Sequence, residues 1–354
     1  MGPLLRRLAP TVGPTLICAL LLATGCVDDQ PSIGGGGADS LVGEVVVEGL
    51  AGPTQLVIDD DGSWWVAQLA GGENDGTGQV VRLDPDALDA EPEVILDGLD
   101  KPTGVALFAG ELWVMERNRL TRGPIDGAVD GSDRTVVADD LPSNGRSEGT
   151  LTADGDRLLY DTSGRLEPDG TATPGSGTLW AVTVVADATA EISTVAAGFK
   201  HAYAHARTDD GTLYATEIGD GRYDGEPALD ELVPVVEGVD HGWPRCVGDN
   251  RAVVEYGGTE AGCAEVPGSL ALFAAGATPT SVVAAPWDPE LLLVALWNKG
   301  QVVAVSSTAG DPAAFDVVYT GAEHPQHLTV DGDRVLLTDH VAGRVVALTN
   351  PSSE

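Results

Sequence analysis

Short runs of alternating apolar and polar residues recur along the chain from residue 43 onwards, separated by turns rich in Asp and Gly. Such alternation predicts β-strands, and the many Gly and Val residues agree with short strands and turns. The pattern starts with a Gly or Leu, followed shortly by a Pro in every copy but the fourth, and continues with a strand, an Asp/Gly turn and a second strand. The copies start at Gly49, Gly98, Leu141, Gly198, Gly276 and Gly321. Because two further strands lie between copies, the sequence predicts an all-β fold, a six-bladed β-propeller.

The two ends of the repeated region predict how the ring closes. The last copy is one strand short and ends at residues 343–349, whereas an unassigned strand at residues 44–48 precedes the first copy. Pairing these two strands would complete the last blade and leave no long unpaired edge. We therefore expect the propeller to span residues 43–350.

The first residues have the features of an export signal. Arg6 and Arg7 precede an apolar run that ends in small residues directly before Cys26. The run is short for a membrane span and resembles a bacterial lipobox. We expect residues 1–25 to be removed and Cys26 to be lipidated, with ordinary secretion as the alternative. Residues 26–42 would then be a flexible tether. The protein is expected at the cell envelope, facing the periplasm or the exterior, with the lipid anchor as its membrane contact.

Export also bears on the remaining cysteines. Cys18 lies within the signal and Cys26 is the lipidation candidate, which leaves Cys246 and Cys263. In an oxidising compartment a disulfide between them would stabilise the fold by about 3 kcal/mol. A metal pair is the weaker interpretation, because neither Cys has a close Cys or His at zinc spacing.

Charge and motifs exclude several classes of function. The chain has 55 Asp and Glu residues against 19 Lys and Arg, a formal net charge of −36. Such an acidic protein is not expected to bind nucleic acid, whose phosphates require basic surfaces. The sequence has no Gly-x-Ser-x-Gly motif and no phosphate-binding glycine loop. Nucleophilic hydrolysis and nucleotide chemistry therefore have no support.

Basic residues recur at the start of several copies, where the innermost strand of a blade meets the mouth of the central channel. Superposing the copies places Lys101, His201 and His324 at one position, with Lys200 beside His201. Gln55 and His327 follow further along their copies, and the third copy has Arg146 and Glu148 at its start. We expect these side chains to gather at the channel mouth as the binding site. The alternative is that they bond to neighbouring blades and to exposed carboxylates.

A long acidic insertion in the fourth copy, residues 219–246, is the second candidate site. It contains Asp230 and Glu231 among glycine-rich segments. Carboxylates with irregular backbone suit calcium, which takes six to eight oxygen ligands. We expect calcium near Asp230 and Glu231; a solvated acidic loop is the alternative.

A run of motifs around this insertion resembles the glucose/sorbosone dehydrogenase family, soluble propellers that use pyrroloquinoline quinone. The motifs are Gly198-Phe199-Lys200, Leu213-Tyr214, Asp230-Glu231-Leu232 and Gly242-Trp243-Pro244, followed by the Cys246 and Cys263 pair. The resemblance implies oxidation of a sugar or related alcohol at the channel mouth. It also implies the quinone as electron acceptor, a calcium ion that polarises the quinone, and a His as general base.

The chain departs from the family pattern at the base. The family has His-x-Gly-Gly at the start of the third blade, where this chain has Arg146-Ser147-Glu148-Gly149. We expect Glu148 or His201 to have taken over the catalytic role. The cofactor would be contacted by basic and polar groups at the blade starts: Gln55, Lys101, Arg146, Lys200, His324 and His327. The alternative function is a non-catalytic surface propeller that binds a glycan or a partner protein.

Overall fold

The computed structural model describes residues 40–69, 77–143, 148–185, 189–310 and 312–353. All of them belong to the compact unit Gly34–Glu354. The predicted signal peptide (1–25) and the lipidation candidate Cys26 lie outside the described residues. Within the described part of the chain, no helix is long and apolar enough to cross a membrane.

Six antiparallel sheets of four strands each make up the fold, which confirms the predicted six-bladed β-propeller. The first two blades are β2 to β5 (Pro53–Ile58, Trp64–Leu69, Gly78–Leu83, Glu93–Leu99) and β6 to β9 (Gly104–Phe108, Glu111–Met115, Leu120–Gly123, Thr135–Ala138). The third is β10 to β13 (Thr152–Asp154, Arg157–Thr162, Thr178–Val184, Ala190–Ala197). The fourth is β14, β15, β18 and β21 (Ala202–Arg207, Leu213–Glu217, Asp230–Pro234, Ala271–Phe273).

The fifth blade is β22 to β25 (Pro279–Ala285, Asp288–Leu296, Gln301–Ser306, Phe315–Tyr319). The sixth combines β26, β27 and β28 (Pro325–Asp331, Arg334–Asp339, Arg344–Thr349) with β1 (Val42–Glu48). Short elements lie outside the blades: the hairpins β16–β17 (Arg222–Tyr223, Glu226–Pro227) and β19–β20 (Cys246–Val247, Arg251–Ala252), helix α1 (Glu260–Cys263), and the 3₁₀ turns η2 (Val254–Tyr256), η3 (Trp297–Lys299) and η4 (Pro351–Ser353).

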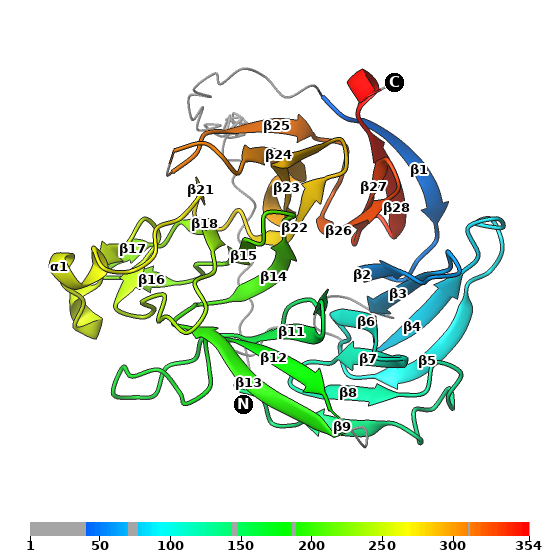
Figure 1. Ribbon diagram of the computed structural model, residues 1–354, viewed down its shortest axis with the longest axis horizontal. Helices are drawn as coiled ribbons and strands as arrows, with labels where there is room; N and C mark the ends of the chain where they lie inside the picture. Colours follow the sequence, from blue (N-terminus) through cyan, green and yellow to red (C-terminus); the bar gives the residue numbers. More distant parts are fainter. Residues whose placement is uncertain (1–39, 70–76, 144–147, 186–188, 311, 354) are drawn as a thin grey trace, which may run out of the picture. The chain divides into compact units, whose positions relative to one another are not determined.

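The innermost strands of the blades form a closed ring. Strands β2, β6, β10, β14, β22 and β26 each contact the next in this order, and β26 contacts β2 (Figure 1). The ring is completed by antiparallel pairing of β1 with β28, from Val42 opposite Thr349 to Glu48 opposite Arg344. The predicted closure of the last blade by the strand before the first copy is therefore confirmed.

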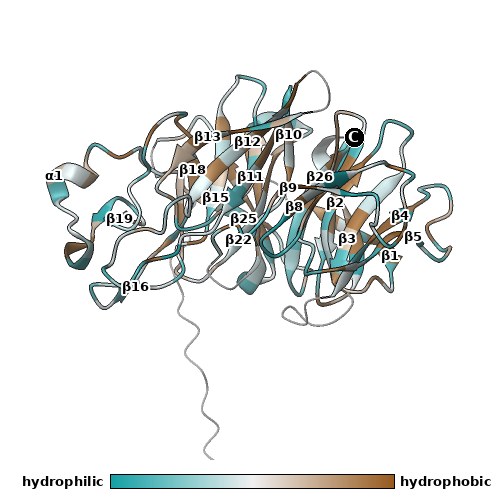
Figure 2. Ribbon diagram, turned by 90° about the horizontal axis from the view of Figure 1, so that it is seen from below, coloured by the Kyte–Doolittle hydropathy of each residue, from teal (hydrophilic) through white to brown (hydrophobic). Residues whose placement is uncertain are grey.

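The hydrophobic core lies between neighbouring blades. One cluster joins Leu336 of the sixth blade to Trp64 of the first, and another joins Trp65 of the first blade to Leu112 of the second. Successive side chains of a strand point to opposite faces of the sheet, so Trp64 and Trp65 pack against different neighbours. In Figure 2 the apolar segments follow the strands, whereas the connecting loops are mostly hydrophilic.

Gln55 connects three blades through its amide group. Its Nε2 donates to the Leu151 carbonyl at 2.6 Å, and its Oε1 accepts from the backbone N–H groups of Leu151 and Val105 at 2.9 and 3.0 Å. These bonds are buried, so an apolar side chain here would leave three backbone groups unpaired. Gln55, predicted as a cofactor contact, is engaged in holding blades together.

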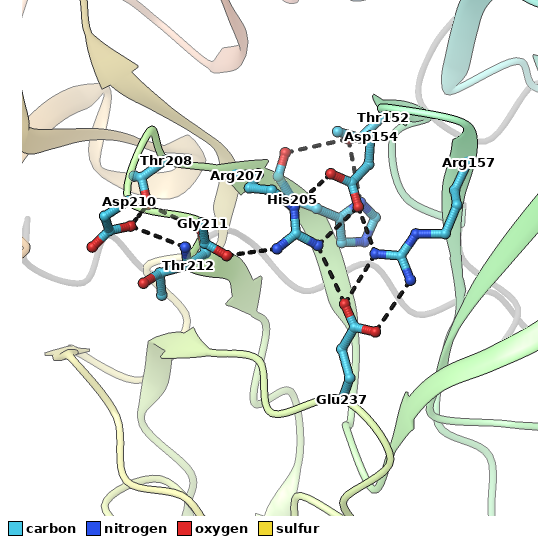
Figure 3. Close-up of polar contacts among 10 residues, drawn as sticks. All are labelled: Thr152, Asp154, Arg157, His205, Arg207, Thr208, Asp210, Gly211, Thr212 and Glu237. Atoms are coloured by element: carbon cyan, nitrogen blue, oxygen red, sulfur yellow. Dashed lines mark hydrogen bonds and ion pairs between the residues drawn. The ribbon is translucent and has the colours of Figure 1, made fainter.

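A charged network joins the third and fourth blades away from the start of their inner strands (Figure 3). Asp154 at the end of β10 accepts from Arg207 Nε at 2.6 Å and from Arg157 Nη2 at 2.7 Å. Glu237 in turn accepts from Arg157 at 2.9 Å. The bonds from Arg207, followed by those from Arg157, hold the pKa of the Asp154 carboxyl below its usual value.

The predicted insertion of the fourth blade is two separate excursions on either side of a blade strand. Hairpin β16–β17 lies before β18, whereas β19–β20 and α1 lie between β18 and β21. The second excursion contains the Cys246–Cys263 disulfide, which confirms the predicted pairing. The sequence suggested a single insertion at residues 219–246; instead Asp230-Glu231-Leu232, in the middle of that range, is the buried start of β18.

Two buried carboxylates face each other within the fourth blade. Glu217 of β15 and Glu231 of β18 are directly opposite in register, and like charges in that position repel. Burial first, and then the charge of Glu231, raise the pKa of Glu217 to about 8. Burial also raises the pKa of Glu231 to about 7, although a bond from Ser269 opposes the shift.

These shifts predict a fall in stability above neutral pH. Between about pH 6.5 and 8 both carboxyls are ionised in the unfolded chain but partly protonated in the folded one, so rising pH removes protons from the folded state alone. The unfolding free energy should fall on the order of 1 to 2 kcal/mol, roughly 3 to 6 °C in Tm. The lowered pKa values of His241 and His327 act in the opposite direction near the lower end of this range, so the difference between the wild type and Glu231→Gln isolates the carboxyl pair. Thermal melts of the wild type and Glu231→Gln should show a flatter pH dependence in the variant; parallel curves would contradict the assignment.

The connection through Gln55 predicts a large cost for an apolar replacement. Gln55→Leu should lower the unfolding free energy by at least about 2 kcal/mol, because buried backbone groups lose their partners. Gln79→Leu is the control, since the Gln79 amide bonds to two side chains, Gln68 and the exposed Asp97, and to no described residue of another blade. It should stay within about 0.5 kcal/mol of the wild type. Denaturant titration measures both, and equal stabilities would show that the bonds of Gln55 contribute little.

Candidate functional site

A cavity of about 160 Å³ opens where the starts of the innermost strands meet the ends of the second strands; it is called the channel cavity below. Its lining comes from five blades: Thr54, Leu69, Thr103, His201, Tyr203, Ile218, Asp220, Thr278, Thr280, Trp297, Asn298, Gln326 and His340. None of the Lys and Arg residues that the structure describes lines this cavity. Hydroxyl, amide and imidazole groups therefore dominate, and such a lining suits a neutral ligand rich in hydrogen-bonding groups.

One wall of the channel cavity is aromatic. Trp297 is half-buried, and its ring centroid lies 4.7 Å from that of His324 and 5.1 Å from that of His340. On the opposite side Gln326 Nε2 donates to the Tyr203 hydroxyl at 2.7 Å. An aromatic face beside fixed polar groups is a common arrangement for holding one face of a sugar ring.

Three buried ionisable side chains meet at the edge of this cavity. Glu148, Asp161 and His201 each bring a potential ligand atom within 4.8 Å of the other two, and we call them the channel cluster. His201 Nε2 lies 3.2 Å from Asp161 Oδ2, yet neither atom has a hydrogen-bond partner among the described residues. His201 is the cluster member that lines the channel cavity.

The backbone of the third blade places the two acids. Gly149 donates its N–H to Asp161 Oδ1 at 2.8 Å, and a Cβ on Gly149 would lie 2.0 Å from the Tyr203 carbonyl oxygen. The chain can therefore pass the fourth blade this closely with glycine alone, which sets the position of Glu148. Glu148 accepts from the Ser163 N–H at 2.7 Å. Burial, and then the neighbouring Asp161, raise the pKa of Glu148 well above its ordinary value.

A second cavity, of about 580 Å³, lies beside the first and is called the basic cavity. It is lined by Ser143, Gly164, Arg165, Leu166, Lys200, Asp220, Gly221, Arg222, Tyr223, Trp243 and Tyr256. Arg165 and Arg222 are exposed, and Lys200 Nζ lies 6.0 Å from the centre of the Trp243 ring. In a chain of charge −36, this cavity concentrates positive charge next to aromatic surfaces.

The two cavities are adjacent. Asp220 lines both of them, and the consecutive residues Lys200 and His201 line the basic cavity and the channel cavity respectively. The wall between them is held by the family-like motifs: the Trp243 N–H donates to the Gly198 carbonyl at 2.8 Å, and Trp243 Nε1 donates to the Tyr223 hydroxyl at 2.9 Å.

The structure brings some of the predicted site residues together and separates others. Glu148 and His201 meet in the channel cluster, and Lys200 reaches the basic cavity. Gln55 and Lys101 are buried and line neither cavity. Arg146 lies outside the described residues.

The remaining histidines occupy supporting positions. His324 packs against Trp297 and so lies behind the wall of the channel cavity. His327 Nδ1 lies 3.1 Å from the Thr329 hydroxyl, and burial lowers the pKa of His327 to about 3. A histidine with so low a pKa is neutral and adds no positive charge to the channel at neutral pH.

Asp230 and Glu231, near which the sequence predicts calcium, are each held by different hydrogen bonds. They are consecutive residues of β18, so their side chains point to opposite faces of the sheet. Asp230 accepts from the N–H groups of Gly219 and Thr278, both at 2.7 Å, whereas Glu231 accepts from Ser269. The two carboxylates thus serve different parts of the blade.

Sequence reasoning missed several residues of the site. Asp161 lies at the end of a strand, and its approach to His201 depends on the packing of two blades. Trp297 and His340 follow the second strands of their blades, which is a recurring position that a closer comparison of the copies would have shown. Arg165 lies in a loop and Arg222 in the short hairpin strand β16, and neither segment belongs to the repeated pattern.

Comparison with known proteins establishes the fold. No family profile matches the sequence, and no curated protein is significantly similar to it. Among solved structures, a calcium structure of a Trichoderma reesei carbohydrate-active enzyme of family AA12 matches with TM-score 0.69 and 17% identity, over 88% of this chain and 96% of that chain. A putative oxidoreductase (glucose dehydrogenase) from Thermus thermophilus matches with TM-score 0.66 and 18% identity, over 87% and 99%.

The aldose sugar dehydrogenase from Streptomyces coelicolor, in its form with bound pyrroloquinoline quinone, matches with TM-score 0.67 and 15% identity, over 88% of this chain and 99% of that chain. At these identities the similarity shows a shared architecture. The chain therefore has the six-bladed propeller fold of the quinone-dependent sugar dehydrogenases to which its motifs were compared.

Proposed function

We propose that the protein is an oxidoreductase that oxidises a hydroxyl group of a sugar or related alcohol in the channel cavity, using a quinone held in the basic cavity. One observation carries the proposal: the consecutive residues Lys200 and His201 open into two adjacent cavities of opposite character. A neutral, polar cavity lies directly beside one that is basic and aromatic. The solved structures with the same fold include an aldose sugar dehydrogenase with bound pyrroloquinoline quinone, which supports a quinone as the cofactor.

The residues present fit pyrroloquinoline quinone in the basic cavity and not in the channel cavity. The cofactor is a flat fused-ring quinone whose carboxylates require positive partners. Arg165, Lys200 and Arg222 supply such partners, and Trp243 and Tyr256 supply ring faces. When bound, the quinone would supply the electron acceptor for alcohol oxidation.

The channel cluster would receive the proton of the substrate hydroxyl. The His201 side chain is buried and lines the channel cavity, so its imidazole is the group placed to accept a proton from a ligand there. The Asp161 carboxylate, held by the Gly149 N–H, lies 3.2 Å away and would stabilise the imidazolium that forms. In this arrangement His201 acts as the base and Asp161 as its positioning partner.

We also propose that the protein works outside the cytoplasm, anchored by lipid at Cys26. The disulfide between Cys246 and Cys263 supports this location, since such bonds persist mainly in oxidising compartments.

Turnover tests the role of His201. The chain without residues 1–25 should, with pyrroloquinoline quinone and calcium present, reduce an artificial electron acceptor when aldoses are added. His201→Gln should lower the rate roughly 100- to 10,000-fold, because the proton acceptor is lost, while quinone binding is retained. His324→Gln, which changes a histidine behind the cavity wall, should keep most of the activity. A fully active His201→Gln would place the base elsewhere.

Cofactor titration tests the basic cavity. The absorbance of the quinone should report saturable binding, and Arg165→Gln combined with Arg222→Gln should weaken it about tenfold or more, with a smaller dependence on salt. Arg82→Gln is the control, because Arg82 pairs with Glu93 on the first blade. Unchanged affinity in the double variant would exclude this cavity. Complete absence of binding by the wild type would favour a non-catalytic surface propeller.

A further inference from the structure

The channel cluster combines features that a hydrogen-bonded structural pair does not explain. His201 Nε2 and Asp161 Oδ2 are 3.2 Å apart, and each belongs to a side chain that is more than nine-tenths buried. Their mutual geometry does not satisfy a hydrogen bond, and neither atom has another partner among the described residues. A buried polar atom without a hydrogen-bond partner is energetically costly. Two such atoms that face each other therefore indicate a site for a ligand that contacts both.

The separation of the two atoms matches that of neighbouring ligands on one metal ion. Nitrogen and oxygen ligands lie about 2.0 to 2.2 Å from zinc, which places two adjacent ligand atoms roughly 2.8 to 3.1 Å apart at right angles and roughly 3.3 to 3.6 Å apart at tetrahedral angles, on either side of the 3.2 Å between His201 and Asp161. Glu148 offers a third ligand atom within 4.8 Å of both. The three side chains therefore offer one nitrogen and two oxygen ligand atoms to a single ion.

The charge of the cluster also favours a cation. Glu148 and Asp161 are both fully buried, so water screens the repulsion between their negative charges poorly. Glu148 accepts bonds from the Ser163 N–H and hydroxyl, which are neutral donors and do not balance its charge. A divalent ion would stabilise both ionised carboxylates.

Each ligand is already oriented by a further contact. Gly149 donates to the second oxygen of Asp161, Ser163 donates to Glu148, and the His201 ring packs edge-on against Tyr203 with centroids 5.1 Å apart. Partners of this kind fix ligand orientation in established metal sites.

We propose that Glu148, Asp161 and His201 form a binding site for a divalent first-row transition metal, with an open coordination position that faces the channel cavity. One imidazole nitrogen with two carboxylates suits zinc, manganese or iron, whereas calcium takes oxygen ligands alone. His201 lines the cavity, so a ligand oxygen in the cavity would complete the coordination.

The inference stands on the cluster and does not require the proposed oxidation. A metal ion and a proton would compete for His201 Nε2. This nitrogen would therefore be a ligand in the metal-loaded protein and a base in the metal-free protein. In the metal-loaded protein a bound hydroxyl would be acidified by the cation, and in the metal-free protein the imidazole would act directly.

Metal titration without quinone tests the site. The chelator-treated protein lacking residues 1–25 is titrated with Zn²⁺, Mn²⁺ and Co²⁺ by calorimetry, and the visible spectrum of Co²⁺ is recorded. We expect one saturable site, a rise in Tm on loading, and a Co²⁺ spectrum that indicates a nitrogen ligand. Ca²⁺ should not displace the metal.

Isosteric variants assign the ligands. Glu148→Gln, Asp161→Asn and His201→Gln should each weaken metal binding by at least roughly 100-fold. Loss of a residue that only hydrogen-bonds to a metal ligand already weakens binding by about 10- to 100-fold. Glu116→Gln changes a buried carboxylate of the second blade, which pairs with Arg119, and should bind normally. No saturable binding, or equal binding by all variants, would overturn the proposal. Because quinone is absent, failure here would leave the turnover test of the proposed function unaffected.

Discussion

Closure of the ring by β1 and β28 is the constraint on which the rest of the structure depends. Each blade buries apolar side chains on both of its faces, so every blade needs two neighbours. An open ring would expose two faces and leave an unpaired strand edge. Strand β1 therefore supplies the outer strand of the last blade. The closed ring that results brings the starts of the innermost strands together at one end of the channel.

That geometry concentrates chemistry in a small volume. Residues distant in the chain, such as Thr54 and Gln326, line the same channel cavity. The fourth blade contributes most, because its first strand starts at the junction of both cavities and its excursions form one wall of the basic cavity. Lys200 and His201 thus serve different cavities although they are neighbours in sequence. The proposed oxidation depends on this division, with the hydroxyl on one side and the electron acceptor on the other.

Buried acids are the recurring cost of this architecture. Glu217 and Glu231 oppose each other across two strands, and Glu148 and Asp161 meet at the channel. In the first pair protonation relieves the repulsion, which makes stability depend on pH. In the second pair a nearby histidine with an orphaned nitrogen provides a further ligand atom, and a bound cation would relieve the repulsion without protonation.

The sequence by itself determined the six blades, the closing strand and the disulfide, because strand alternation, repeat spacing and cysteine number are local or countable features. It also identified His201 and Glu148 from their positions at blade starts. Gln55 shows the limit: the same kind of position became a connection among three blades, since the direction of its side chain depends on packing. Asp161 joined the site through tertiary structure alone, because contact between blades is set by the ring and leaves no pattern along the chain.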